Sequence, residues 1–109
     1  MLPAMPYFAL FYEVVDGFVD RRLPYRPSHL ALVEDAHRRG ELQLAGALLD
    51  REPAGDGARR ADGALLVFRT DDVSAVERFV DADPYVRNGL VKSWRIREWA
   101  NVLGDAAVR

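Results

Sequence analysis

Few side chains in this 109-residue sequence could carry chemistry, since it holds two histidines and no cysteine. His29 stands in PSHLALVEDA, where apolar residues recur at helical spacing, so its ring is expected at the edge of a buried helix face. Burial and the positive end of the helix dipole favour a neutral imidazole, whereas a nearby carboxylate favours the imidazolium. A histidine balanced in this way suits a general base. The same pattern also fits a core histidine bonded to a backbone carbonyl.

Asp83 is the second candidate, in the stretch DADPYVRNGL. Asp followed by Pro84 is typical of a helix N-cap, and Asn88-Gly89 predicts the end of a short turn. A cap alone accounts for this residue. A carboxylate nevertheless has about four lone-pair positions, so it can accept from backbone N–H groups and from an imidazole together. Such an aspartate would fix the histidine tautomer and stabilise the imidazolium without taking the proton.

Four further residues are candidates for binding a substrate. Arg26 precedes His29 by one helical turn, and its planar guanidinium could bind an anionic substrate or a phenolate. It also fits an exposed cation at the start of a helix. Tyr7, Tyr85 and Trp94 could line an apolar pocket and stack on a ring, although each also fits the core or a dimer interface.

Other chemistries find little support in the sequence. His29 and His37 are eight residues apart and lack the four-residue spacing of helical metal pairs, so we expect no metal site. The GDG of residues 55–57 lacks the strand, helix and lysine of a phosphate-binding loop. There is no GxSxG motif, and no redox cofactor is implied.

Composition and charge narrow the class of partner. The chain fits one domain, half of its residues are apolar, and 15 basic against 17 acidic side chains leave it slightly negative. We therefore expect no nucleic acid and no membrane as partner. The opening MLPAMPYFAL lacks the basic and long apolar parts of a signal peptide, which favours a cytoplasmic protein.

The elements that must position these residues follow from periodicity and from turn signals. A loop is predicted at 16–27, leading through Pro27 into a helix that Gly40 ends. The second predicted loop, 50–63, is dense in glycine, proline and charge. In chain order we expect strand 7–14, helix 26–39, strand 41–49, strand 64–69, a helix from Asp71 or Asp72, a short turn from Asp83, and strand 91–99.

This order predicts an α+β, ferredoxin-like βαββαβ fold with an antiparallel four-stranded sheet. Two helices cover only one sheet face, yet strands 7–14 and 64–69 are apolar on both faces. In 41–49, Leu42, Leu44, Gly46 and Leu48 are expected to share one face. Because a large exposed apolar surface is rare in a monomer, we expect a homodimer through the sheet faces.

The ordered spacing of several short motifs resembles the YciI-like (YCII-related) family. The motifs are Arg26-x-x-His29-Leu30, Gly40-Glu41-Leu42 with Gly46, Asp83-Pro84-Tyr85 with Gly89-Leu90, and Trp99. The resemblance spans nearly the whole chain and implies a single domain over 1–109. It also implies a dimeric α+β barrel and an active-site pair at His29 and Asp83.

The resemblance implies cofactor-free acid/base chemistry on a small cyclic or aromatic compound. Elimination, isomerisation and hydrolysis would each suit one His/Asp pair, and the substrate stays open. The alternative is a non-enzymatic small-ligand-binding or accessory dimeric module that uses the same pocket. A purely structural dimerisation domain would need no polar pair at all.

Overall fold

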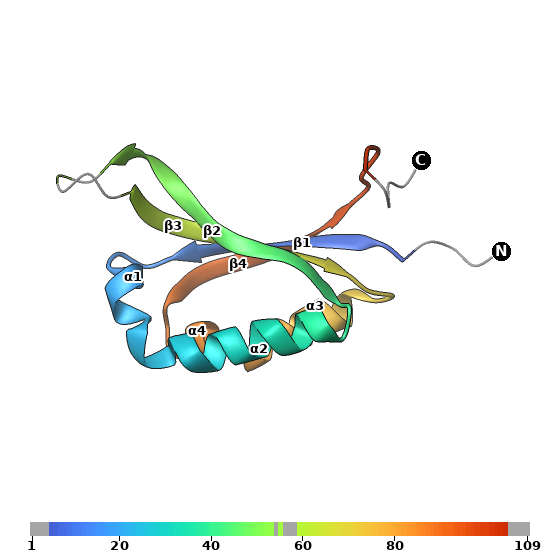
Figure 1. Ribbon diagram of the computed structural model, residues 1–109, viewed down its shortest axis with the longest axis horizontal. Coiled ribbons are helices and arrows are strands. Elements are labelled where there is room, and N and C mark those ends of the chain that lie inside the picture. Colours follow the sequence, from blue (N-terminus) through green and yellow to red (C-terminus); the bar gives the residue numbers. More distant parts are fainter. Residues whose placement is uncertain (1–4, 54, 56–58, 105–109) are drawn as a thin grey trace.

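A computed structural model describes residues 5–53, 55 and 59–104 of the chain (Figure 1). The elements in chain order are β1 (Tyr7–Val14), α1 (Phe18–Arg21), the 3-10 helix η1 (Leu23–Tyr25), α2 (Arg26–Arg38), β2 (Leu42–Pro53), β3 (Arg59–Arg69), α3 (Val73–Ala82), α4 (Pro84–Arg87) and β4 (Val91–Trp99). Three of them, α1, η1 and α4, are only three or four residues long.

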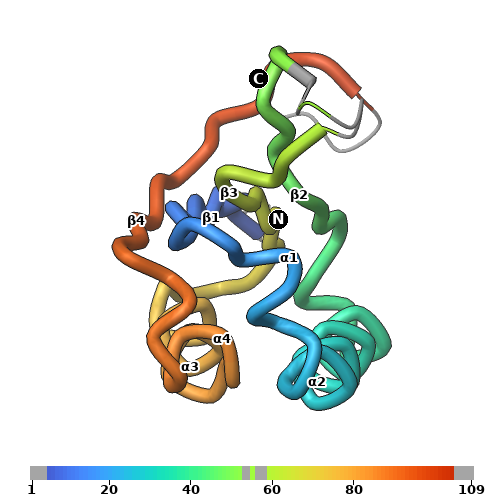
Figure 2. Tube along the Cα trace, turned by 90° about the vertical axis from the view of Figure 1, so that its left-hand side faces the viewer, coloured from blue at the N-terminus to red at the C-terminus, as the bar shows by residue number. Residues whose placement is uncertain are grey.

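The strands form one antiparallel sheet in the order β2-β3-β1-β4. Seen from the end, α2 and the α3–α4 pair lie side by side on the same face of this sheet (Figure 2). This arrangement confirms the α+β, ferredoxin-like prediction. Among the described elements, no helix covers the other face of the sheet. Within the described residues, no helix is long and apolar enough to span a membrane.

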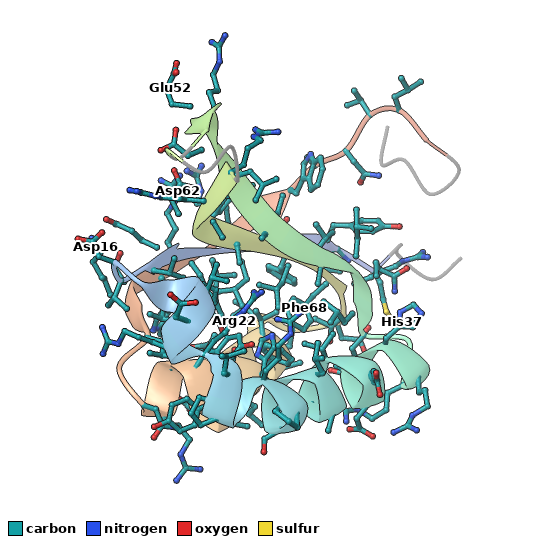
Figure 3. All side chains as sticks on the ribbon, turned by 60° about the vertical axis from the view of Figure 1, so that its left-hand side comes forward. Asp16, Arg22, His37, Glu52, Asp62 and Phe68 are labelled. Atoms are coloured by element: carbon teal, nitrogen blue, oxygen red, sulfur yellow. The ribbon has the colours of Figure 1, made fainter. Side chains whose placement is uncertain are left out.

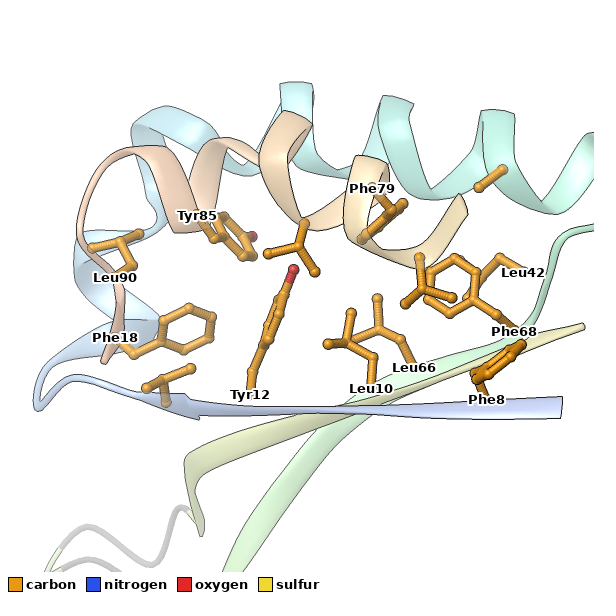
Figure 4. Close-up of a cluster of buried hydrophobic side chains, with 14 residues drawn as sticks. Phe8, Leu10, Tyr12, Phe18, Leu42, Leu66, Phe68, Phe79, Tyr85 and Leu90 are labelled. Carbon is orange, nitrogen blue, oxygen red and sulfur yellow. The ribbon is translucent and has the colours of Figure 1, made fainter. Parts of the chain in front are cut away.

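The core lies between the sheet and the helices (Figure 4). Alternate residues of β1 point into it, and residues paired with them across β3 do the same, because directly opposed side chains share a face. The helices add the apolar stripe predicted for α3. The core residues on these elements are Phe8, Leu10, Tyr12, Val14, Leu66, Phe68, Val76, Phe79 and Val80.

Two predicted loops are partly regular structure. β2 continues through Pro53 and β3 already begins at Arg59, so most of the predicted loop 50–63 is a strand hairpin that projects from the sheet (Figure 1). Residues 54 and 56–58 lie outside the described residues. The other predicted loop, 16–27, contains α1, η1 and the start of α2. The charged residues and prolines of this segment favour a loop, but it forms two short helical turns. Among the residues of α1 and η1, only Phe18 is buried in the core.

The prediction that Leu42 and Leu44 share one face was wrong. The register with β3 shifts between them, so that Leu42 pairs with Phe68 and Leu44 pairs with Val67. Because of this irregularity, the side chains after it point to the opposite face from the one that strict alternation predicts. Leu42 is therefore buried under α2, whereas 71% of Leu44 is exposed on the opposite face.

The predicted caps of the last two helices are confirmed. Asp72 precedes α3, and its Oδ1 accepts from the backbone N–H of Ser74 at 3.1 Å. Asp83 both ends α3 and caps α4, where its Oδ1 accepts from the backbone N–H of Tyr85 at 3.0 Å. Gly89 follows with φ of +74°, a left-handed conformation that glycine adopts without strain. These caps fix the joint between α3 and α4 at Asp83.

Candidate active site

Four elements bring polar side chains together inside the helix layer. His29 comes from the start of α2, Asp83 from the joint between α3 and α4, Tyr85 from α4 and Tyr12 from β1. Figure 4 shows Tyr12 rising from the sheet, with its hydroxyl oxygen directed toward the helices. Segments separated by up to 71 residues therefore meet at one carboxylate.

Asp83 is fully buried, and both of its oxygens are occupied. Its Oδ1 lies 2.8 Å from Nδ1 of His29 and also accepts the capping bond from Tyr85 N–H at 3.0 Å. Its Oδ2 accepts a hydrogen bond from the Tyr12 hydroxyl at 2.8 Å. A buried carboxylate is costly unless it is hydrogen-bonded, and three donors meet that requirement here.

The contact with Asp83 assigns the proton of the neutral His29 ring. An ionised carboxylate can only accept, so Nδ1 of His29 must carry the hydrogen that it donates. The other nitrogen, Nε2, is then unprotonated, and it has no hydrogen-bond partner among the described residues. The His29 side chain is 13% exposed, so the ring is sheltered but not sealed from solvent. This arrangement leaves one basic nitrogen available to a ligand.

Tyr85 holds the imidazole ring from one side. The two rings are stacked, with centroids 3.8 Å apart and planes 12° from parallel. Phe18 meets Tyr85 edge to face at 5.3 Å, so the stack rests on the core. The Tyr85 hydroxyl accepts a long hydrogen bond, 3.4 Å, from Nη1 of Arg26. His29 is thus oriented by a carboxylate and by an aromatic face.

A cavity of about 210 Å³ opens beside this cluster, between α2 and the strands β2 and β3. Its sheet side is formed by small residues, which leave room above the strands. A Cβ added at one of them, Gly63, would lie 2.6 Å from the backbone oxygen of Tyr12, so only glycine fits there. The small residues are Ala45, Gly46, Ala47, Gly63 and Ala64. The volume suits a small ligand.

The structure brings four of the six predicted site residues together. His29, Arg26 and Tyr85 line the cavity, and Asp83 supports His29 from behind. Tyr7 and Trp94 do not line it. Tyr7 alternates with the core residues of β1 and lies beside Arg69, away from the helices. Trp94 lies on the edge strand β4, beyond Tyr12 of β1, with which it pairs and which itself lines the cavity.

Sequence reasoning missed two residues of this site. Tyr12 stands in the run YFALFYEV, where an aromatic residue resembles ordinary core, and no local signal marked its hydroxyl as a partner of Asp83. Arg22 lines the cavity but stands in the stretch that was predicted to be a loop. The sequence held one signal for Arg22, which stands four residues before Arg26. This spacing would place the two side chains on the same side of a helix.

Burial raises the pKa of Tyr12 well above its ordinary value, and the charge of Asp83 and the hydrogen bond to it act in the same direction. Above pH 10, the ordinary value, the unfolded chain loses this proton while the folded chain retains it. The contribution to stability is therefore complete below about pH 10 and is lost as pH rises further, by up to about 1.4 kcal/mol per pH unit.

Tyr12→Phe is expected to lower the free energy of unfolding at pH 7 by about 1.5–3 kcal/mol, because Oδ2 of Asp83 loses its donor. The variant should also lose less stability than the wild type between pH 9 and pH 11. Urea unfolding across this range measures both effects. Tyr7→Phe is the control, and it is expected to keep the wild-type pH dependence. Parallel pH curves for wild type and Tyr12→Phe would refute the account of Tyr12.

A family model described as the YCII-related domain matches residues 5–100. The chain belongs to this family. This membership confirms the resemblance seen in the ordered motifs. The family match runs from the residues before β1 to the residue after β4, so it includes every element that builds the site.

Curated relatives are similar to this chain over most of their own length. Protein YciI of Escherichia coli O6:H1 is 29% identical over 85 residues, which are 78% of this chain and 87% of that protein. Protein YciI of Shigella flexneri matches equally well. An uncharacterized protein of Haemophilus influenzae is 23% identical over 100 residues, covering 89% of this chain and 99% of the relative.

Two solved structures share the fold. One is 5-chloro-2-hydroxyhydroquinone dehydrochlorinase (TftG) from Burkholderia phenoliruptrix, in complex with 2,5-dihydroxybenzoquinone. It has a TM-score of 0.72 and 22% identity, covering 87% of this chain and 94% of that one. The other, from Pseudomonas aeruginosa, has a TM-score of 0.55 and 12% identity over 91% and 95% of the two chains. Both likenesses support the ferredoxin-like architecture described above.

Proposed function

We propose that this YCII-related protein is an enzyme for cofactor-free acid/base chemistry on a small cyclic or aromatic compound. His29 is the general base or acid, and Asp83 is a positioning residue that holds the Nδ1–H tautomer. Arg26 and Tyr85 are placed to contact the substrate from the cavity wall.

One observation carries this proposal. Nδ1 of His29 lies 2.8 Å from the buried Asp83 carboxylate, while the ring lines a cavity and its Nε2 has no partner within the described residues. A buried histidine that served only the fold would direct its polar atoms to protein partners. His29 instead keeps one nitrogen free beside empty space, as a general base requires.

Elimination of a hydrogen halide is the reaction that we favour. The neighbour TftG is named a dehydrochlorinase. In such an elimination a proton leaves the ring compound and chloride departs from it, and the electron pair left by the proton replaces the pair that chloride carries away. Nε2 of His29 would accept the proton, and Asp83 would stabilise the resulting imidazolium. Neither step requires an electron donor or acceptor outside the substrate.

The direct test is turnover of 5-chloro-2-hydroxyhydroquinone, followed by chloride release. We expect release that depends on enzyme concentration and exceeds the spontaneous rate. Binding of 2,5-dihydroxybenzoquinone without turnover of any halogenated hydroquinone would instead favour a ligand-binding module. If neither compound binds nor reacts, the proposal for this substrate class fails.

We propose in addition that the open sheet face packs on a second copy of the chain. Tyr7, Phe11, Val67, Leu44 and Trp99 share this face by register. Leu44 is 71% exposed and Trp99 48% exposed, which is unusual for side chains of this size at the surface of a monomer. A face-to-face dimer would remove this apolar surface from water.

Leu44→Glu is expected to convert this dimer to a monomer, because two new charges would enter the interface at symmetry-related positions. Sedimentation at micromolar concentration should give twice the mass of one chain for the wild type and the single-chain mass for the variant. Leu23→Glu is the control, since Leu23 is 64% exposed and lies in η1 on the helix side. A wild-type protein that sediments as a monomer would contradict the proposal.

A further inference from the structure

Among the described residues that line the cavity beside His29, two are arginines and none is an aspartate or glutamate. Arg22 lies between α1 and η1, and Arg26 is the first residue of α2. Figure 3 shows Arg22 in the layer between the helices and the sheet. Asp83, close by, contributes one negative charge against these two positive ones, and both of its oxygens are occupied by other donors. The cavity therefore carries an excess of positive charge.

Within the part of the chain that the structure describes, neither Arg22 nor Arg26 forms an ion pair. Nε of Arg22 is buried without a hydrogen-bond partner, and its guanidinium carbon lies 5.5 Å from the centre of the Phe18 ring. Arg26 makes the long bond to the Tyr85 hydroxyl at 3.4 Å. Partly buried charged donors without partners cost free energy, and a bound anion would supply the partner.

The chemistry of the ligand follows from the donors. A guanidinium presents N–H groups in a planar fork, which matches a carboxylate or a pair of anionic ring oxygens better than it matches a neutral carbonyl. The cavity of about 210 Å³ and its wall of alanines and glycines suit a single ring. Arg26 is linked through Tyr85 to the His29 ring, so an anion held by the arginines would lie beside the dyad.

We propose that Arg22, together with Arg26, binds an anionic oxygen substituent of a monocyclic substrate, and that Arg22 sets the preference for charged over neutral rings. This inference rests on the proposed function and identifies the substrate class of the same site. Arg22 contacts the charged substituent, whereas His29 exchanges the proton. Loss of Arg22 should therefore weaken binding of anionic rings selectively.

The test compares two probes that differ in charge. 2,5-Dihydroxybenzoquinone has acidic hydroxyl groups, and its 2,5-dimethoxy analogue cannot ionise. Calorimetric titration of the wild type should show clearly tighter binding of the dihydroxy compound. Arg22→Gln should weaken that binding by roughly 10- to 100-fold, the range expected for one charge-assisted hydrogen bond, and should leave the dimethoxy compound unaffected.

Two further variants control the comparison. Arg21→Gln removes the neighbouring arginine, which is exposed and does not line the cavity, and it should bind both probes as the wild type does. Arg22→Lys keeps the charge but not the fork, so a smaller loss is expected, and this variant carries the test if Arg22→Gln does not fold. Urea unfolding of each variant reports its stability.

Several results would overturn the inference. They are equal affinity of the wild type for the two probes, equal losses in Arg22→Gln and Arg21→Gln, or an equal loss of both probes in Arg22→Gln. Turnover that is indifferent to Arg22 would also reject it while sparing the proposed acid/base function. Conversely, Arg22-dependent binding without turnover would support the inference and reject the enzyme.

Discussion

Replacement of His29 by asparagine is expected to lower kcat for chloride release from 5-chloro-2-hydroxyhydroquinone by about 10²- to 10⁴-fold. The variant loses the basic Nε2 but keeps a polar side chain near Oδ1 of Asp83, so the fold should survive. The binding of 2,5-dihydroxybenzoquinone should change far less than the rate. Steady-state kinetics and calorimetry on the same preparation separate the two effects.

His37→Asn is the matched control, because it removes the other histidine of the chain. His37 lies at the far end of α2, and its Nδ1 is 2.8 Å from the Leu42 carbonyl. Its loss should change stability slightly and the rate per folded molecule not at all. Equal rates for His29→Asn and wild type would remove His29 from the mechanism, whatever the control does.

Changes at Asp83 are expected to affect both rate and stability. Asp83→Ala leaves the Tyr12 hydroxyl and Nδ1 of His29 without their acceptor and also removes the cap of α4. We expect a loss of about 3–5 kcal/mol in the free energy of unfolding, because two donors lose their acceptor and the helix loses its cap. Urea unfolding measures this loss at neutral pH.

Asp72 provides the comparison that isolates capping. It caps α3 through a single bond to Ser74, and it is exposed, so Asp72→Ala should cost only about 0.5–2 kcal/mol. Equal losses for Asp72→Ala and Asp83→Ala would reduce Asp83 to an ordinary cap.

Asp83→Asn separates positioning from stability. The carboxamide keeps the shape, but it can no longer accept from His29 and Tyr12 with separate oxygens. The folded variant should therefore retain ligand binding and lose most of its rate. It should also show a mixture of His29 tautomers by imidazole ¹⁵N NMR. If Asp83 were only a helix cap, its replacement would not change the tautomer of His29. A full rate in folded Asp83→Asn would contradict the positioning role.

The sequence carried enough information for the order of helices and strands along the chain, for the fold class and for the two partners of the dyad. Periodicity distinguished the helices from the strands, and Asp-Pro marked the cap at which Asp83 is buried. What it could not convey is contact across the sequence. Tyr12 resembles an ordinary core residue in the sequence, because the carboxylate that its hydroxyl contacts lies 71 residues away. Only the folded structure shows that contact.

The errors at the strands have physical causes of the same kind. The segment after Leu49 is rich in proline, glycine and charged residues, which favour a loop locally. The pairing between β2 and β3 nevertheless continues through it as far as Pro53 and Arg59. The irregularity at Leu42–Leu44 reverses which side chains are buried, and strict alternation cannot anticipate it. Tyr7 and Trp94 were chosen as aromatic residues, whereas membership of the cavity depends on the face and the strand on which each one lies.

The most direct test of the dyad is the imidazole ¹⁵N spectrum of His29, recorded before and after addition of 2,5-dihydroxybenzoquinone. We expect the Nδ1–H tautomer in the neutral ring, held by Asp83, with Nε2 unprotonated. On addition of the ligand the Nε2 resonance should shift strongly while Nδ1–H persists. An Nε2–H tautomer of the neutral ring in the free protein, or a bound ligand that leaves Nε2 unchanged, would contradict His29 as the acid/base group of this site.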